Sequence, residues 1–117
     1  MPEGHTIHRI ARDHGKFFCG EKLRFSSPQG RFTADAKKIS QQPIRDVTAH
    51  GKHLFYHFSA RKILHIHLGL YGKFKTHRLP LPEPRGAIRL RGIGDSRGFD
   101  LRGPTRCELL GRESFQQ

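Results

Sequence analysis

The feature that most constrains the fold is a pair of alternating segments in the middle of the chain. Residues 52–58 and residues 64–71 interleave large apolar side chains with polar ones. A period of two places alternate side chains on opposite faces of a strand, so both segments are predicted to be β-strands. Residues 59–62 are expected to close a hairpin between them. The second strand would carry Leu64, Ile66, Leu68 and Leu70 on one face and His65, His67, Gly69 and Tyr71 on the other.

The segment before this hairpin begins with a predicted helix at residues 5–18. Apolar residues recur there at helical spacing from Ile7 to Phe18. Thr6 is a candidate N-cap, and Gly20 is a candidate stop signal.

The remaining segments are predicted to be short strands and connections. Residues 22–25 and 87–91 alternate like strands, whereas residues 79–84 are rich in proline and cannot lie inside a sheet. The stretch up to Gln42 is polar, and residues 92–103 are glycine-rich, which favours a mobile or tightly turning segment. One helix followed by antiparallel strands predicts an α+β fold, an N-terminal helix and then an antiparallel β-sandwich or barrel-like domain.

Charge narrows the class of partner. Lys and Arg number 22 and Asp and Glu number 10, which gives a formal net charge of +12. Such an excess attracts polyanions, and nucleic acid is the commonest one for a cytosolic protein. A basic surface for solubility, ribosome contact or membrane contact is the alternative. No apolar run is long enough to span a membrane and no signal core opens the chain, so a cytoplasmic, nucleoid-associated protein is expected, with Cys19 and Cys107 as free thiols rather than a disulfide.

The N-terminus carries the residues with the clearest chemistry. Removal of Met1 would expose the secondary amine of Pro2, and an α-amine has a pKa of about 7.7–8.0, low enough to be partly neutral. Attack of such an amine on an aldehydic or glycosidic carbon gives an iminium cation that acidifies a neighbouring C–H bond. The helix end disfavours protonation of the amine and Glu3 favours it, so the balance stays open. An ordinary Met-Pro start is the alternative.

Four segments carry a resemblance to a known family. They are MPEGHTIHR at residues 1–9, AHGKHLF at residues 49–55, HLGLYG at residues 67–72 and DLRGPT at residues 100–105. With these segments, the sequence resembles the N-terminal catalytic domain of the formamidopyrimidine-DNA glycosylase and endonuclease VIII family, especially the actinobacterial endonuclease VIII-like members. The match extends to about residue 110 and leaves residues 111–117 as an unmatched tail.

The resemblance implies a bifunctional base-excision-repair enzyme that removes oxidised bases and nicks abasic sites. Pro2 matches the nucleophile that forms a Schiff base with the sugar. Glu3 matches the acid that protonates the opening sugar. Lys52 matches a lysine that holds phosphate and donates a proton during elimination. Double-stranded DNA with damaged bases or abasic sites is the implied partner.

Three further residues are implicated in DNA binding. Leu70 and Tyr71 match side chains that fill the gap left by a flipped base, although alternation alone places Leu70 in the core. Gly69 stands where some members have a glutamine, which puts contact with the opposite base in doubt. Arg102 matches an arginine near the DNA.

The family's helix-two-turn-helix region and zinc finger are not present in these 117 residues. No CxxC pair exists, so no cofactor is expected on this chain. A separate chain carrying the missing half is a possible partner, and weak activity is expected for these residues alone because DNA positioning is incomplete. The alternatives are a non-catalytic basic DNA-binding module or decaying gene fragment, and a metal protein built on the histidines. A phosphate-binding P-loop at Lys52 is excluded because residue 46 is aspartate rather than glycine.

Overall fold

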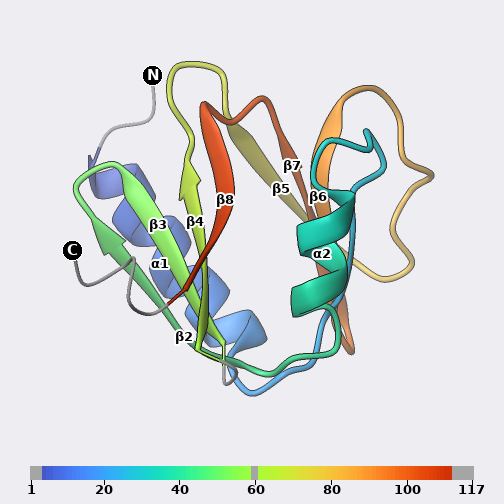
Figure 1. Cartoon of the computed structure of the whole chain (residues 1–117), viewed down its shortest axis with the longest axis horizontal. Coiled ribbons are helices and arrows are strands. Elements are labelled where there is room, and N and C mark those ends of the chain that lie inside the picture. Colours follow the sequence, from blue (N-terminus) through green and yellow to red (C-terminus); the bar gives the residue numbers. More distant parts are fainter. Residues whose placement is uncertain (1–3, 59–60, 112–117) are drawn as a thin grey trace.

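A computed structural model describes residues 4–58 and 61–111 (Figure 1). These described residues form two helices and eight strands, and the strands make two antiparallel sheets. The predicted α+β class, with an N-terminal helix and a β-sandwich, is confirmed. The elements are α1 (Gly4–Phe18), β1 (Arg24–Ser26), α2 (Thr33–Ile39), β2 (Ile44–His50), β3 (His53–Phe58), β4 (Lys62–His67), β5 (Lys73–Arg78), β6 (Ile88–Ile93), β7 (Arg97–Arg102) and β8 (Arg106–Gly111).

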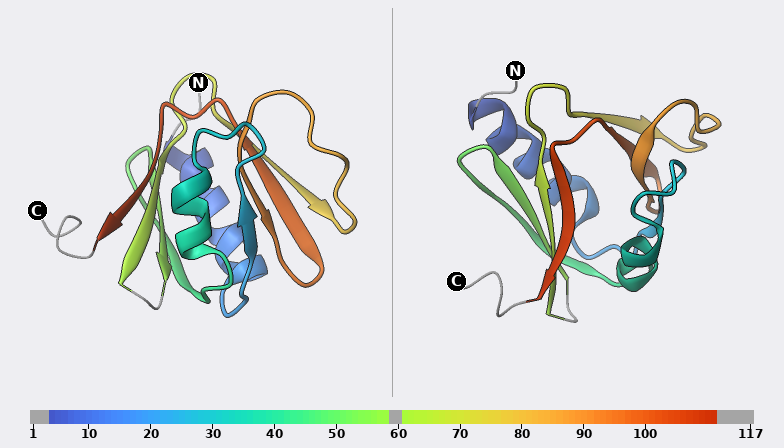
Figure 2. Two further views of the ribbon diagram at one scale, coloured as in Figure 1. Left: turned by 45° about the vertical axis from the view of Figure 1, so that its right-hand side comes forward. Right: turned by 45° about the horizontal axis from the view of Figure 1, so that its top comes forward.

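The sheets face one another and the helices close the openings between them. One sheet has the order β1-β6-β7-β5 and the other has the order β2-β3-β4-β8. Figure 2 shows α1 and α2 on opposite sides of the molecule, each between the edges of the two sheets. The core therefore lies between the sheets and receives side chains from both helices. Its largest fully buried members include Phe18, Ile39, Tyr56, Leu64, Ile66 and Phe99.

Helix α1 forms where the apolar spacing predicts it. Ile7, Ala11, His14 and Phe18 lie on one face and are all buried. The helix ends two residues before Gly20, as the stop signal indicates. Because it begins at Gly4, Thr6 lies inside the first turn, and the predicted N-cap at Thr6 is wrong. No described helix has the length and apolar character needed to cross a membrane.

The central hairpin is also confirmed. Strands β3 and β4 pair antiparallel, with Leu54 opposite Ile66 and Tyr56 opposite Leu64. These inward side chains are fully buried, and Leu68 is nearly so. Alternation fails beyond this point because β4 ends at His67, and the side chain of Leu70 lies in a loop with 55% of its surface exposed.

Two predicted connections are wrong. The glycine-rich residues 92–103 contain the end of β6 and the whole of β7. Gly92 leaves room for the ring of Phe99, because a Cβ at this position would lie 2.7 Å from that ring. The polar stretch contains α2, whose only buried residues are Ala36 and Ile39. Such a short helix with two inward side chains leaves almost no periodic signal.

One polar pair lies inside the core. The Tyr56 hydroxyl and His14 Nδ1 share a hydrogen bond of 2.6 Å, and the His14 imidazole stacks on Phe99 with ring centres 5.3 Å apart. Burial lowers the pKa of His14 to about 4, which outweighs the opposite effect of Asp13. His14 is therefore neutral in the folded protein near pH 7.

Acid should destabilise the domain through His14. The unfolded chain binds a proton at this residue below about pH 6.5 and the folded protein does not until about pH 4. The free energy of unfolding should then fall by about 3 kcal/mol as the pH drops through this window. Urea unfolding at pH 7 and pH 4.5 measures the loss. A double variant, His14→Phe with Tyr56→Phe, removes the titrating group and its partner together and should show a flatter profile; an unchanged profile would contradict the assignment.

Candidate nucleic-acid interface

One end of the sandwich gathers the turns that carry the predicted site residues. Strand β2 turns into β3 through a two-residue loop, Gly51–Lys52, which places Lys52 at an exposed hairpin tip. His53 pairs with His67, so the loop that follows β4 lies at the same end as Lys52. Figure 1 shows the start of α1, the β2–β3 turn and the β4–β5 loop together at the top of the molecule.

The β4–β5 loop is locked against the β7–β8 loop. Gly69 has a φ of +67°, and a Cβ on it would lie 1.8 Å from the Thr105 hydroxyl oxygen. Only glycine therefore suits this position in this chain. With the loop held in this way, the next two side chains point outward: Leu70 is 55% exposed and Tyr71 is 77% exposed. Among the described residues, these two are the large apolar side chains that are exposed.

Replacing Gly69 with alanine should loosen this end of the molecule. The left-handed backbone costs alanine about 1 kcal/mol, and the clash with Thr105 adds to that cost. Gly86→Ala is a matched control, because Gly86 has a φ of +71° and nothing within 4 Å of an added Cβ. Urea unfolding should show a larger loss for Gly69→Ala than for Gly86→Ala. Equal losses would show that the loops are not packed as described.

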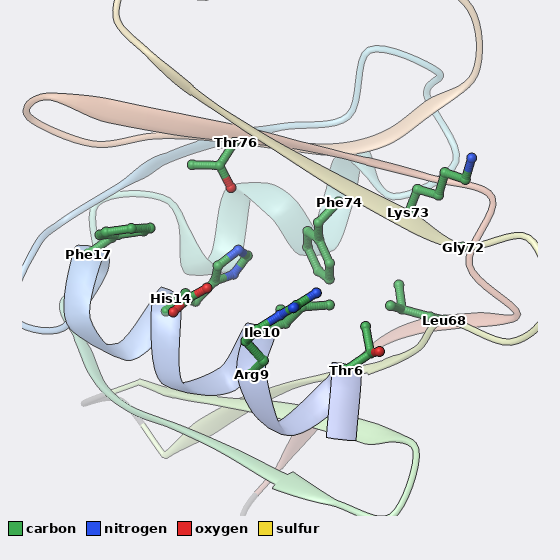
Figure 3. A pocket seen from close by; sticks show the side chains of 11 residues that line it. Thr6, Arg9, Ile10, His14, Phe17, Leu68, Gly72, Lys73, Phe74 and Thr76 are labelled. Atoms are coloured by element: carbon green, nitrogen blue, oxygen red, sulfur yellow. The ribbon is translucent and has the colours of Figure 1, made fainter. Parts of the chain in front are cut away.

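A groove of about 430 Å³ lies between α1 and β5 and reaches this end. Its floor includes Ile10, Leu68 and Phe74, and Thr6 in the first turn of α1 shares it with the β4–β5 loop (Figure 3). The charged residues that line it are Arg9 and Lys73, which are both exposed, and Asp13. The groove therefore brings the beginning of the described chain next to the loop that carries Leu70 and Tyr71.

Pro2 and Glu3 lie outside the described residues. The chain directly after them, from Gly4, is helical and belongs to the same end of the sandwich. Their roles stay predictions.

Arg102 lies at the end of β7, opposite Lys73 in the sheet register. Its guanidinium donates a hydrogen bond of 2.7 Å to the carbonyl of Arg85, so it holds the proline-rich connection in place. A DNA contact for Arg102 stays a prediction.

A histidine row covers the outer face of the other sheet near Lys52. We use this name for His53, His65 and His67. His53 Nδ1 lies 2.8 Å from His65 Nε2, and His65 Nδ1 lies 2.8 Å from a Glu108 carboxylate oxygen. The rings of His53 and His67 are 4.4 Å apart. Desolvation, followed by the neighbouring His67, His65 and Arg106, lowers the pKa of His53.

These contacts were not predicted from the sequence. The period of two places His65 and His67 on one strand face, but Glu108 joins them only through the pairing of β4 with β8. Among the described residues, no three His, Cys, Asp or Glu side chains form an arrangement that could hold a metal ion.

Fold and site together define a helix-closed β-sandwich domain with a basic end, where Arg9, Lys52, Lys73 and Arg106 are all exposed. Comparison with family models matches residues 1–107 to the formamidopyrimidine-DNA glycosylase N-terminal domain. The chain therefore belongs to the formamidopyrimidine-DNA glycosylase family and carries its N-terminal domain.

Individual relatives agree with this assignment. "Endonuclease 8 1" of Mycobacterium tuberculosis is 49% identical over 114 residues, which are 94% of this chain and 42% of the relative. "Endonuclease 8" of Pectobacterium carotovorum is 29% identical over 119 residues, which cover 98% of this chain and 44% of the relative. The chain thus spans less than half the length of the curated relatives it matches.

Solved structures share the fold. MutM in complex with DNA containing carbocyclic 8-oxo-G superposes with a TM-score of 0.83 at 18% identity, over 98% of this chain and 47% of that one. Lactococcus lactis formamidopyrimidine-DNA glycosylase bound to DNA with an abasic site gives a TM-score of 0.82 at 18% identity, with the same coverage.

Proposed function

We propose that this domain supplies the chemistry of a base-excision-repair DNA glycosylase and abasic-site lyase that acts on oxidised bases in duplex DNA. The observation that carries the proposal is that the β2–β3 turn with Lys52, the β4–β5 loop with Leu70 and Tyr71, and the first turn of α1 share one basic end of the sandwich. Family membership supports the general role in DNA repair.

The proposed reaction uses the residues in a fixed order. The Pro2 nitrogen attacks C1′ of the damaged nucleotide, the bond from C1′ to the base breaks, and the proton of the Pro2 nitrogen passes to the departing base. Glu3 donates a proton to the ring oxygen as the sugar opens, which leaves an iminium between Pro2 and C1′. Loss of a C2′ proton then breaks the C3′–O bond and nicks the strand. Lys52, an exposed cation on a short hairpin, holds the phosphate and acts as a proton donor in this step.

The Leu70–Tyr71 pair is proposed to fill the gap left by the flipped nucleotide. Unstacking a base costs a few kcal/mol, and an apolar or aromatic wedge offsets part of that cost. Both side chains are exposed on a loop that its packing against Thr105 holds in place. A wedge must be both exposed and rigidly held, and this loop satisfies both conditions.

Tyr71→Ala should weaken binding of a lesion-containing duplex and leave the fold unchanged. Stacking of a base on an aromatic side chain is worth about 1–3 kcal/mol, and the Tyr71 side chain contributes little to the core. Fluorescence anisotropy with an abasic-site duplex measures the affinity. Tyr56→Phe is the control, because it also removes a tyrosine but lies in the core. Unchanged affinity for Tyr71→Ala would argue against the wedge.

Borohydride reduction of the protein on an abasic-site duplex tests the proposed chemistry. A Schiff base is reduced to a stable covalent adduct, so a protein–DNA cross-link is expected. A non-catalytic DNA-binding module would bind the same duplex without cross-linking. The absence of a cross-link from any protein that contains this domain would contradict the proposal.

A further inference from the structure

The outer face of the β2-β3-β4-β8 sheet carries a hydrogen-bonded chain of three titratable side chains that ends beside Lys52. Glu108 on β8 contacts His65 on β4, and His65 contacts His53 on β3, with both distances 2.8 Å. His53 follows Lys52 directly in the sequence. These hydrogen bonds therefore link a carboxylate on the far edge of the sheet to the hairpin that carries the proposed phosphate-binding lysine.

While Glu108 is ionised, the two imidazoles can keep both hydrogen bonds either as a neutral pair or with one additional proton. With Glu108 ionised, its carboxylate accepts from His65 Nδ1–H. The bond between the two imidazoles holds a single proton, which lies on either ring. In the neutral pair, His53 donates through Nδ1–H to His65 Nε2, so His53 Nε2 is left without a proton and can only accept. One additional proton from solvent converts His53 Nε2 into a donor.

The surroundings set the balance between these states. His65 is largely buried against Phe55, whose ring stacks on it at 4.9 Å with an interplanar angle of 9°. Glu108 favours the extra proton, and its other neighbour Arg106 lies 3.6 Å from the same carboxylate oxygen.

Other groups near His53 oppose the extra proton. The ring of His67 on β4 lies beside the ring of His53, and His50 on β2 is the residue that pairs with His53. Lys52 adds a neighbouring positive charge. Together with desolvation, the histidines and Arg106 lower the pKa of His53. These groups therefore disfavour the extra proton on His53 in the free protein. An anion placed against His53 Nε2 would reverse this balance, because it favours the protonated form.

We propose that Glu108 and His65 are positioning residues that load one proton onto His53 when a phosphate oxygen of bound DNA reaches its Nε2, next to Lys52. This inference rests on the proposed function, since it requires DNA at the basic end. The atoms balance: one proton leaves the solvent, the shared proton shifts between the imidazoles, and Nε2–H donates to the phosphate. DNA affinity should then rise as the pH falls, with uptake of about one proton per duplex at this site.

Glu108→Gln separates this relay from a structural role. Glutamine keeps an oxygen that accepts from His65 Nδ1–H but lacks the charge that supports the extra proton. Loss of a negative charge would by itself strengthen binding to DNA. The relay predicts the opposite: at pH 7.5 the affinity should fall by up to about tenfold, and it should recover when the pH is lowered. Glu83→Gln makes the same charge change on the exposed proline-rich connection and is the control.

The experiment has two parts. Imidazole NMR of the free 117-residue chain should show His65 protonated at Nδ1 and a lower pKa of His53 in Glu108→Gln than in the unmodified protein. Calorimetry with an uncleavable abasic-site duplex, in two buffers of different ionisation enthalpy, should then show proton uptake that Glu108→Gln reduces at pH 7.5 and Glu83→Gln leaves unchanged. Binding without proton uptake, or equal behaviour of the two variants, would overturn the relay while leaving the proposed function intact. Failure of every variant to bind DNA at any pH would overturn both.

Discussion

Pro2→Gly should nearly abolish cross-linking to an abasic-site duplex under borohydride. Glycine retains an α-amine, but a primary amine gives an imine that needs a separate proton before it becomes an electron sink. Removing one catalytic group commonly costs about a hundredfold or more, so the trapping rate should fall by at least that factor. The rate is measured by the appearance of the covalent adduct on a denaturing gel.

A matched proline variant shows whether the loss is specific. Pro28→Gly makes the same substitution in an exposed turn far along the chain, and it should trap at the rate of the unmodified protein. Equal trapping by Pro2→Gly and Pro28→Gly would remove Pro2 from the mechanism and point to a lysine as the nucleophile.

Asp100→Ala should cost the domain a large part of its stability. The Asp100 carboxylate accepts two hydrogen bonds from Arg91, of 2.7 and 2.9 Å, and the exposed fractions of the two residues are 2% and 7%. Removing one partner of a buried ion pair leaves an uncompensated charge and typically costs about 3–5 kcal/mol, against a total stability of about 5–15 kcal/mol for a small domain. The guanidinium would keep only its 2.7 Å bond to the Pro82 carbonyl.

Urea unfolding compares this variant with two others. Asp35→Ala breaks an exposed pair with Lys38 and should cost less than about 1 kcal/mol. Replacing both Arg91 and Asp100 with apolar residues of similar volume should recover much of the lost stability. If Asp100→Ala and Asp35→Ala reduced the free energy of unfolding equally, the buried Arg91–Asp100 pair would not stabilise the contact between the proline-rich connection and β6.

Periodicity predicts the parts of this fold that have one clear inner face. Helix α1 and the β3–β4 hairpin were predictable because apolar residues recur along them at a regular interval. Strands β6 and β7 were not, because glycines that accommodate Phe99 look like turn residues in a sequence. Helix α2 escaped prediction because only two of its seven residues are buried.

The sequence likewise predicted some residues of the candidate site and missed others. Motifs identified Lys52, Leu70 and Tyr71, and the structure adds that all three are exposed in loops at one end of the sandwich. Alternation alone would have buried Leu70, since it cannot show where β4 stops. The link from His65 to Glu108 spans 43 residues and depends on strand pairing, which no local pattern reports.

Mass spectrometry of the borohydride-reduced complex tests the central claim most directly, because it locates the atom that carries the sugar. After nuclease and protease digestion, the added mass of the reduced sugar should lie on the peptide that begins with Pro2, with Met1 removed. An intact Met1 on the cross-linked protein, or a sugar attached to Lys52 or another lysine, would contradict the claim that the N-terminal proline is the nucleophile.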